Sequence, residues 1–212
     1  MKFKTIFWDN DGTLVNTEVP FFLATQKVLA SVGIELTEEW NANECLKKGR
    51  SSFELAEAAG IDEETIQKLR ERRDELYFKE LKKNVEVMEG VIPTLEELYG
   101  RVPMGIVTTS PRMHFNQIMK ATGLGKYFDF TICGDEVEQI KPHPEPYLKA
   151  WRISGFKKSE CLVIEDTGRG LTAAKRAGLP CFICPTAYSK GTDFSQADKV
   201  IDNVSEILEF FN

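Results

Sequence analysis

Two carboxylates that could do chemistry together, Asp9 and Asp11, directly follow an apolar run near the start of the chain. Carboxylates this close repel each other, and a hard cation such as Mg²⁺, which takes oxygen ligands, would relieve that repulsion. Gly12 comes next and allows a sharp turn or a close approach of the backbone to a ligand. Taken alone, this D-x-D-G pattern fits an acidic turn as well as it fits a site.

Three further polar groups stand at or near the ends of other apolar runs. They are Thr108-Thr109-Ser110, Lys141-Pro142-His143-Pro144 and Glu165-Asp166. A cation held by the outer acids, with the lysine and a hydroxyl opposite, would clamp a tetrahedral anion and leave one carboxylate able to attack it. Phosphoryl transfer needs mainly such positioning, together with positive charge against the phosphoryl oxygens and a nucleophile in line. The set therefore points to phosphoryl chemistry.

Short apolar runs alternate with helical patterns over most of the chain. We expect strands at residues 3–8, 102–108, 128–133, 161–165, 180–184 and 199–201, helices that begin at 111, 145 and 171, and a closing helix up to 211. Such alternation predicts an α/β fold with a doubly wound, mainly parallel sheet, which is a Rossmann-like core. Ligands bind beyond the carboxyl ends of the strands in an open α/β sheet, so the polar groups would meet in one crevice.

One long stretch interrupts this alternation. Residues 16–86 carry helical patterns only, at 21–32, 36–46, 51–59 and 62–82. We therefore expect a catalytic core made of residues 1–15 and 87–212, with residues 16–86 inserted as an all-helical cap domain. The cap would open and close about hinges near residues 15–19 and 84–90.

The composition disfavours several classes of partner. The 212 residues carry a net charge of −6, which argues against nucleic acid or an anionic membrane as the main partner. No apolar run approaches the roughly 18 residues that a membrane helix needs. The 5 cysteines are scattered and odd in number, which suits a reducing cytoplasm better than a disulfide framework. We expect a cytoplasmic protein, a monomer rather than an oligomer, that acts on a small molecule.

The polar groups also carry a family resemblance. The segments Asp9-x-Asp11-Gly12-Thr13-Leu14, Thr108, Lys141-Pro142 and Glu165-Asp166-Thr167-Gly168-x-Gly170 resemble, in order and spacing, the four signature motifs of the haloacid dehalogenase superfamily. The helical insertion resembles the small cap of its β-phosphoglucomutase-like and phosphoglycolate phosphatase-like branch. The resemblance covers essentially the whole chain.

The resemblance implies a role for each acidic residue. Asp9 would be the nucleophile that becomes an aspartyl-phosphate, and Asp11 would protonate the leaving oxygen and later activate water. The carboxylates of Asp9 and Asp166, with the backbone carbonyl of Asp11, would hold Mg²⁺ as the cofactor. Glu165 would be a metal ligand directly or through water. Because the dehalogenases lack the second aspartate, the chain does not resemble those enzymes.

The resemblance also assigns the residues that would bind the phosphoryl group. Thr108 would hydrogen-bond a phosphoryl oxygen, and Lys141 would offset the charge of Asp9 and the phosphate. Backbone N–H groups near Asn10, Asp11 and Thr109 could serve as further donors. In the cap, Arg50 is the candidate for binding the polar end of the substrate. A solvent-exposed arginine at the start of a helix is an equally good interpretation.

These implications predict a Mg²⁺-dependent phosphatase that hydrolyses a small phosphorylated metabolite, of the sugar phosphate or phosphoglycolate type. A sugar-phosphate mutase of the β-phosphoglucomutase type is the alternative on the same scaffold. Phe21 and Ser52 stand where the mutases are expected to carry a histidine and an arginine, which favours hydrolysis. A non-catalytic binding or regulatory protein is the alternative from another class. Ser110-Pro111 is typical of a helix start, with the serine as N-cap.

Overall fold

The computed structural model describes residues 3–46, 50–82, 85–187, 189 and 191–211. Contacts between Cα atoms divide the chain into two compact units. The first consists of Met1–Asn16 and Glu86–Asn212, and the second of Thr17–Val85.

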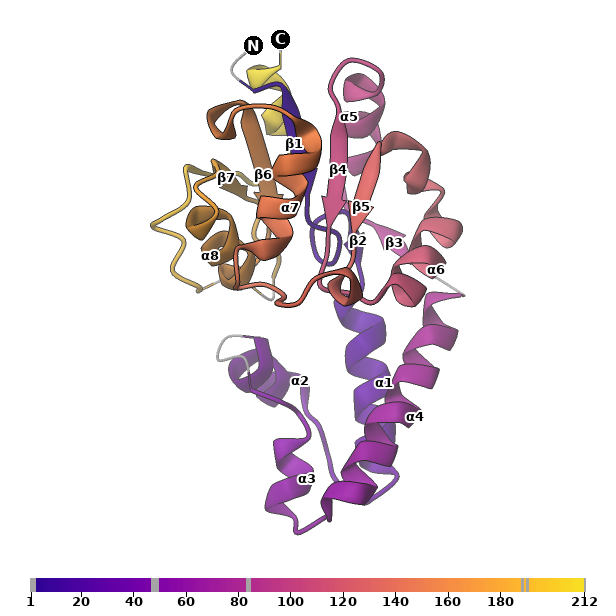
Figure 1. Cartoon of the computed structure of the whole chain (residues 1–212). Coiled ribbons are helices and arrows are strands. Elements are labelled where there is room, and N and C mark those ends of the chain that lie inside the picture. The colour runs from indigo at the N-terminus through magenta and orange to yellow at the C-terminus, as the bar shows by residue number, and fades with distance from the viewer. Residues whose placement is uncertain (1–2, 47–49, 83–84, 188, 190, 212) are drawn as a thin grey trace. The chain divides into compact units, whose positions relative to one another are not determined.

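A parallel sheet of six strands forms the centre of the first unit, in the order β5-β4-β1-β6-β7-β8 (Figure 1). The strands are β1 (Thr5–Trp8), β4 (Met104–Val107), β5 (Phe130–Ile132), β6 (Cys161–Glu165), β7 (Cys181–Ile183) and β8 (Lys199–Val200). β1 lies between β4 and β6, where Ile6 pairs with Met104 on one side and Leu162 on the other. Every residue of β1, β4 and β6 is buried, because parallel strands are covered on both faces. The predicted α/β fold with a Rossmann-like sheet is confirmed.

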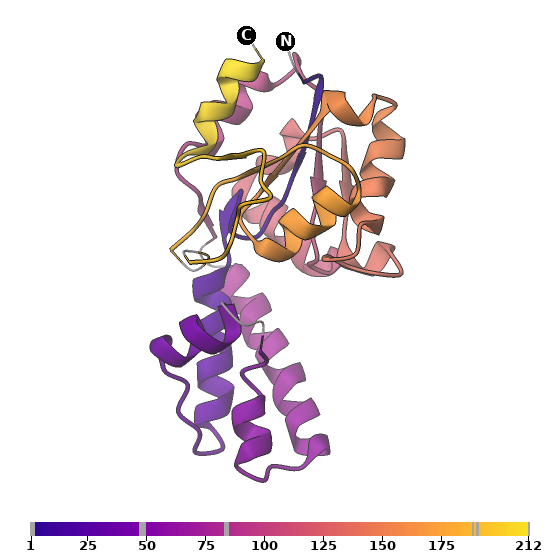
Figure 2. The ribbon, with the colours of Figure 1, turned by 90° about the vertical axis from the view of Figure 1, so that its left-hand side faces the viewer.

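Helices cover the two faces of this sheet (Figure 2). On one face, α7 (Glu145–Ser154) and α8 (Gly168–Arg176) contribute Tyr147 and Leu171 to a core that also contains Phe7. On the other face, α5 (Val91–Leu98) lies beside the 3-10 helix η5 (Val204–Phe210). Between β4 and β5 the chain forms α6 (Arg112–Thr122) and a short 3-10 helix (Leu124–Tyr127). Two further 3-10 turns cover Gly134–Glu136 and Lys158–Glu160.

The second unit is helical and has its own core. It contains α1 (Glu18–Ala30), α2 (Glu38–Trp40), a π-helical segment (Asn41–Leu46), α3 (Glu54–Ala58) and α4 (Glu63–Leu81). Helices α1 and α4 run side by side (Figure 1). The buried apolar residues of this core are Val28, Leu29, Leu36, Phe53, Ala56, Ile66 and Leu69.

Three details differ from the sequence prediction. A two-stranded antiparallel ribbon of β2 (Val15–Asn16) and β3 (Glu86–Val87) stands at the ends of the inserted stretch, where no strand was expected. Two residues are too few to show a periodic pattern. Helix α5 was not predicted, and the closing helix is a 3-10 helix rather than an α-helix. Among the described residues, no helix has the length and apolar character needed to span a membrane.

Candidate active site

The predicted site residues of the first unit gather at one edge of the sheet because its strands are parallel. Asp9 directly follows β1, Thr108 directly follows β4, and Glu165 ends β6. Backbone hydrogen bonds continue past the strand ends: Asp9 N–H donates to the carbonyl of Ile164 at 2.9 Å, and Thr108 N–H donates to that of Ile132 at 2.9 Å. These bonds hold the backbone of Asp9 and Thr108 in place, and with it the starting points of their buried side chains.

Lys141 connects two of the acids. Its side chain is 3% exposed, and its Nζ donates to Asp9 Oδ1 at 2.6 Å, to Glu165 Oε1 at 2.6 Å and to the carbonyl of Val107 at 2.7 Å. An ammonium has three hydrogens, so these bonds use all of them. The lysine therefore holds Asp9 and Glu165 in fixed positions.

The ammonium of Lys141 is outnumbered by carboxylates. Burial and the charge of Glu165 raise the pKa of Asp9 to about 8, although Lys141 lowers it. Burial disfavours the charged form of Lys141, but Asp9 and Glu165 together raise its pKa above the ordinary value. The pKa values of Asp9 and Lys141 are both raised because one buried ammonium is shared by two buried carboxylates. The site therefore favours a second cation.

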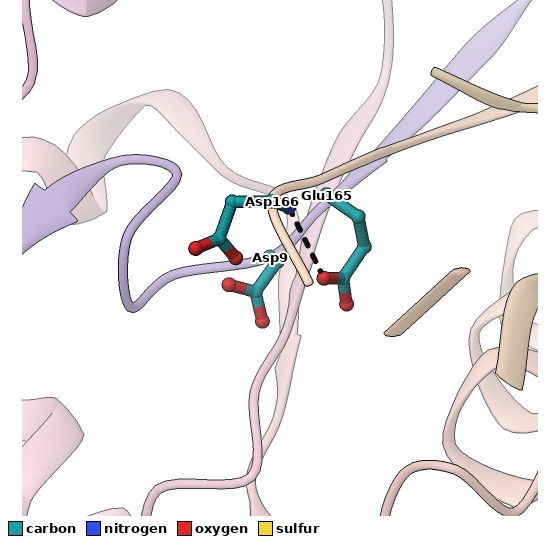
Figure 3. A group of neighbouring side chains, drawn as sticks. All are labelled: Asp9, Glu165 and Asp166. Atoms are coloured by element: carbon teal, nitrogen blue, oxygen red, sulfur yellow. Dashed lines mark hydrogen bonds between the residues drawn. The ribbon is translucent and has the colours of Figure 1, made fainter. Parts of the chain in front are cut away.

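Three carboxylates are placed so that they could hold such a cation. Asp9, Glu165 and Asp166 are buried, and each offers an oxygen within 4.8 Å of the others (Figure 3). Gly12 is needed at this place, because its φ is +88° and a Cβ atom there would lie 2.2 Å from Asp166 Oδ2. The turn that carries Asp11 can therefore approach Asp166 only with glycine.

Glu165 has further partners that the sequence did not reveal. Tyr147 donates its hydroxyl to Glu165 Oε1 at 2.7 Å, and Thr167 donates its own to Oε2 at 3.0 Å. The backbone N–H of Asp166 also donates to Oε2, at 3.3 Å (Figure 3). Both oxygens of Glu165 are thus engaged within the protein. The sequence does not single out Tyr147, because its position on α7 fits an apolar helix face.

Asp11 is held by two hydroxyls from the loop after β4. Its Oδ2 accepts hydrogen bonds from Thr108 Oγ1 at 2.8 Å and from Ser110 Oγ at 2.9 Å. Ser110 was predicted to cap the following helix, and that prediction is wrong. Pro111 occupies the N-cap position of α6 without a side-chain cap bond, while the Ser110 hydroxyl bonds to the carboxylate, which is a stronger acceptor.

Comparison with known proteins decides the family. A family described as haloacid dehalogenase-like hydrolase matches residues 6–184. The chain belongs to the haloacid dehalogenase-like hydrolase family.

Relatives of this hydrolase match it over almost its full length. Protein CbbY from Rhodobacter capsulatus is 30% identical, with 97% of this chain and 95% of the relative covered. A phosphoglycolate phosphatase from Photorhabdus laumondii is 27% identical, covering 97% and 91%. A mutant CbbY from Rhodobacter sphaeroides, solved in complex with xylulose-1,5-bisphosphate, superposes with a TM-score of 0.80 at 23% identity over 97% and 96% of the two chains. The prediction that the chain is a hydrolytic enzyme of this family is confirmed.

Two predicted phosphate-binding residues of the hydrolase lie beside its acids. Asn10 is fully buried, and its carbonyl accepts the N–H groups of Leu14 at 2.9 Å and Val15 at 3.1 Å. Within the described part of the chain, neither atom of the Asn10 side-chain amide has a hydrogen-bond partner. Thr109 is half-buried and adjoins Thr108. The use of their backbone N–H groups for phosphate stays a prediction.

Arg50 belongs to the helical unit of the hydrolase. Its guanidinium bonds to Glu44 at 2.8 Å and to Glu54 at 2.6 Å. It lines a cavity of about 200 Å³ within that unit, together with Phe21 and Arg73. Residues 47–49, which directly precede Arg50, lie outside the described residues.

Proposed function

We propose that the hydrolase is a Mg²⁺-dependent phosphatase that acts on a small phosphorylated metabolite through an aspartyl-phosphate. The observation that carries this proposal is the pairing of two aspartates with opposite surroundings. The ammonium of Lys141 bonds to Asp9 and favours its carboxylate form, which is the form that can attack phosphorus. Asp11 is held by neutral hydroxyls, which allow it to exchange a proton. The phosphoglycolate phosphatase relative and the sugar bisphosphate bound to CbbY support a substrate of this size and charge.

The acidic residues fit a magnesium ion by their chemistry. Mg²⁺ takes oxygen ligands, and a carboxylate cluster carrying more negative than positive charge is a suitable set. We propose that Asp9, Asp166 and the backbone carbonyl of Asp11 hold the ion. The oxygens of Glu165 already accept hydrogen bonds from Lys141, Tyr147 and Thr167. Glu165 would therefore bind the ion through a water molecule. When bound, the ion would offset the charge on the phosphoryl oxygens.

In the first step a carboxylate oxygen of Asp9 attacks phosphorus. The new bond joins Asp9 to the phosphoryl group, and the bond from phosphorus to the leaving oxygen breaks with its electron pair on that oxygen. Asp11 gives its proton to the leaving oxygen, which departs as an alcohol. Thr108 donates to a phosphoryl oxygen, and Lys141 keeps its bond to Asp9 and places positive charge beside the reacting group.

In the second step water attacks the same phosphorus atom. Asp11, now a carboxylate, takes a proton from that water. The bond between Asp9 and phosphorus breaks, which restores the Asp9 carboxylate and releases inorganic phosphate. The cycle ends with the proton on Asp11, as it began.

We also propose that residues 17–85 act as the cap that selects the substrate. Arg50 would be a contact to the part of the substrate that carries no reacting phosphate. Arg50→Ala should then raise KM for the preferred substrate, while an unselective phenyl phosphate should be hydrolysed as by the wild type.

The test is phosphate release from a panel of phosphorylated sugars, phosphoglycolate and nucleotides, with and without Mg²⁺. Asp9→Asn is the control, because an amide cannot form the acyl phosphate and keeps the size of the side chain. Release that depends on Mg²⁺ and disappears in Asp9→Asn supports the proposal. With ³²P-labelled 4-nitrophenyl phosphate, whose leaving group needs no proton, acid-quenched Asp11→Asn protein should carry label, since only the second step then depends on Asp11.

The alternatives give different results in the same experiment. A mutase would convert a sugar phosphate into its isomer, would need a bisphosphate activator, and would leave the phosphate on the product. A non-catalytic protein would bind phosphorylated ligands without turnover or labelling.

A further inference from the structure

We propose that Ser110 is a positioning residue that keeps Asp11 aligned as the proton carrier while Thr108 turns to the phosphoryl group. This inference rests on the proposed function. It starts from the hydrogen bonds of three side chains, since Thr108 and Ser110 both donate to Asp11 Oδ2, at 2.8 and 2.9 Å. The N–H of Ser110 donates in turn to Thr108 Oγ1 at 3.0 Å.

Counting hydrogens shows why two hydroxyls are present. A threonine hydroxyl has one hydrogen, and Thr108 donates it to Asp11 in this structure. If Thr108 donates to a phosphoryl oxygen, the same hydrogen must leave Asp11. Ser110 then still donates to Asp11 Oδ2, so the other oxygen, Oδ1, keeps its direction for proton exchange with the leaving group.

The backbone around Ser110 is tied to the neighbouring strand, which makes its hydroxyl a fixed donor. The carbonyl of Ser110 accepts the N–H of Gly134 at 3.0 Å, and the N–H of Thr108 bonds to Ile132 at 2.9 Å. Two residues later, Arg112 bonds through its N–H to Asp135 at 2.9 Å and through its guanidinium to Glu136 at 2.6 Å. The loop after β4 is thus held at both ends, and Ser110 needs no movement to keep its bond.

A crystal structure with orthovanadate, which takes the place of the phosphoryl group, tests the geometry directly. In the wild type with Mg²⁺ and vanadate we expect Thr108 Oγ1 within hydrogen-bond distance of a vanadate oxygen and Ser110 Oγ still on Asp11 Oδ2. If Ser110 leaves Asp11 and bonds to vanadate instead, the inference is wrong. This readout does not depend on turnover, so it remains decisive even if no substrate is hydrolysed and the proposed function fails.

Kinetics with two kinds of leaving group tests the consequence. An alkoxide needs a proton to depart, and a nitrophenolate does not. Ser110→Ala should slow hydrolysis of the preferred alkyl phosphate by about tenfold in kcat, with KM little changed, and slow that of 4-nitrophenyl phosphate less than about threefold. Ser110→Thr, which keeps a hydroxyl, should restore the alkyl phosphate rate.

The matched control is Ser154→Ala. Ser154 is a half-buried serine of the same unit whose hydroxyl donates to the carbonyl of Trp151 at 2.8 Å, away from the acids. It should leave both rates unchanged. Equal loss on both substrates in Ser110→Ala, or failure of Ser110→Thr to restore the rate, would overturn the positioning role and leave a structural one.

Discussion

At the scale of single residues, the site depends on a few buried contacts whose loss can be measured. Tyr147 is fully buried and donates to Glu165 Oε1, the same oxygen that accepts from Lys141. Tyr147→Phe removes one donor from a buried carboxylate and keeps the ring. We expect the free energy of unfolding in urea to fall by about 2 kcal/mol, as for other hydrogen bonds to charged groups. An unchanged unfolding midpoint would show that Glu165 does not need this bond.

A substitution of Asn10 should raise the free energy of unfolding rather than lower it. Its buried amide has no hydrogen-bond partner among the described residues, and such a group keeps its desolvation cost. Asn10→Leu keeps the branching and the number of heavy atoms of the side chain, and it has no polar atom to bury. We expect it to raise the free energy of unfolding by about 1 kcal/mol. A lower thermal midpoint would mean that the amide has a partner in solution.

Asp9 should make the stability of the metal-free protein depend on pH. Burial and Glu165 raise its pKa from 3.8 to about 8 in the folded state. Between these values the folded chain binds a proton that the unfolded chain does not, so stability falls as pH rises through this window. We expect the wild type in EDTA to lose on the order of 1 kcal/mol more per pH unit between pH 5 and 7 than Asp9→Asn.

Magnesium should reverse this trend, because it binds the deprotonated carboxylate. Saturating Mg²⁺ should therefore raise the thermal midpoint of the wild type more at pH 8 than at pH 5, and should have little effect on Asp9→Asn. An equal rise at both values of pH would contradict the link between Asp9 and the ion.

At the scale of elements, the sequence predicts the strands and helices that are determined by neighbouring residues. It does not predict contacts between residues that are far apart in the chain. The strand that precedes Asp9 and the strand that ends at Glu165 are short, mainly apolar runs, and both are present. The ribbon β2–β3 was missed because it consists of two pairs, Val15 with Val87 and Asn16 with Glu86, which are far apart in the chain. Ser110 was misassigned for the same reason. Its partner, Asp11, lies 99 residues away, and only the folded sheet brings them together.

Helix α4 shows a cap that was locally encoded. Asp62 occupies its N-cap position and accepts the backbone N–H of Thr65 at 2.9 Å and its hydroxyl at 2.8 Å. Asp62→Ala should cost the helical unit about 1 kcal/mol, which hydrogen exchange of α4 amides would report. Asp62→Asn, which keeps an acceptor, should restore most of the protection. Equal exchange in wild type and Asp62→Ala would show that packing alone holds this end.

At the scale of the whole molecule, the two units have separate cores, and the chain passes between them only at β2 and β3. Asn16 pairs with Glu86 in the ribbon, so a two-residue Asn-Gly turn could join these residues directly in place of Thr17–Val85. Because the buried residues around Phe7 and Tyr147 all come from the first unit, we expect the shortened chain to fold cooperatively.

Function should separate in the same way. The acids, Lys141 and Thr108 all belong to the retained unit, so Mg²⁺ should still raise the thermal midpoint, and 4-nitrophenyl phosphate should be hydrolysed within about tenfold of the wild-type rate. The preference among phosphorylated metabolites should be lost, since the proposed selecting contact, Arg50, is gone. A shortened chain that folds and binds Mg²⁺ but keeps the wild-type preference would place substrate selection in the sheet-containing unit. One that folds but hydrolyses nothing would show that residues 17–85 supply part of the chemistry itself.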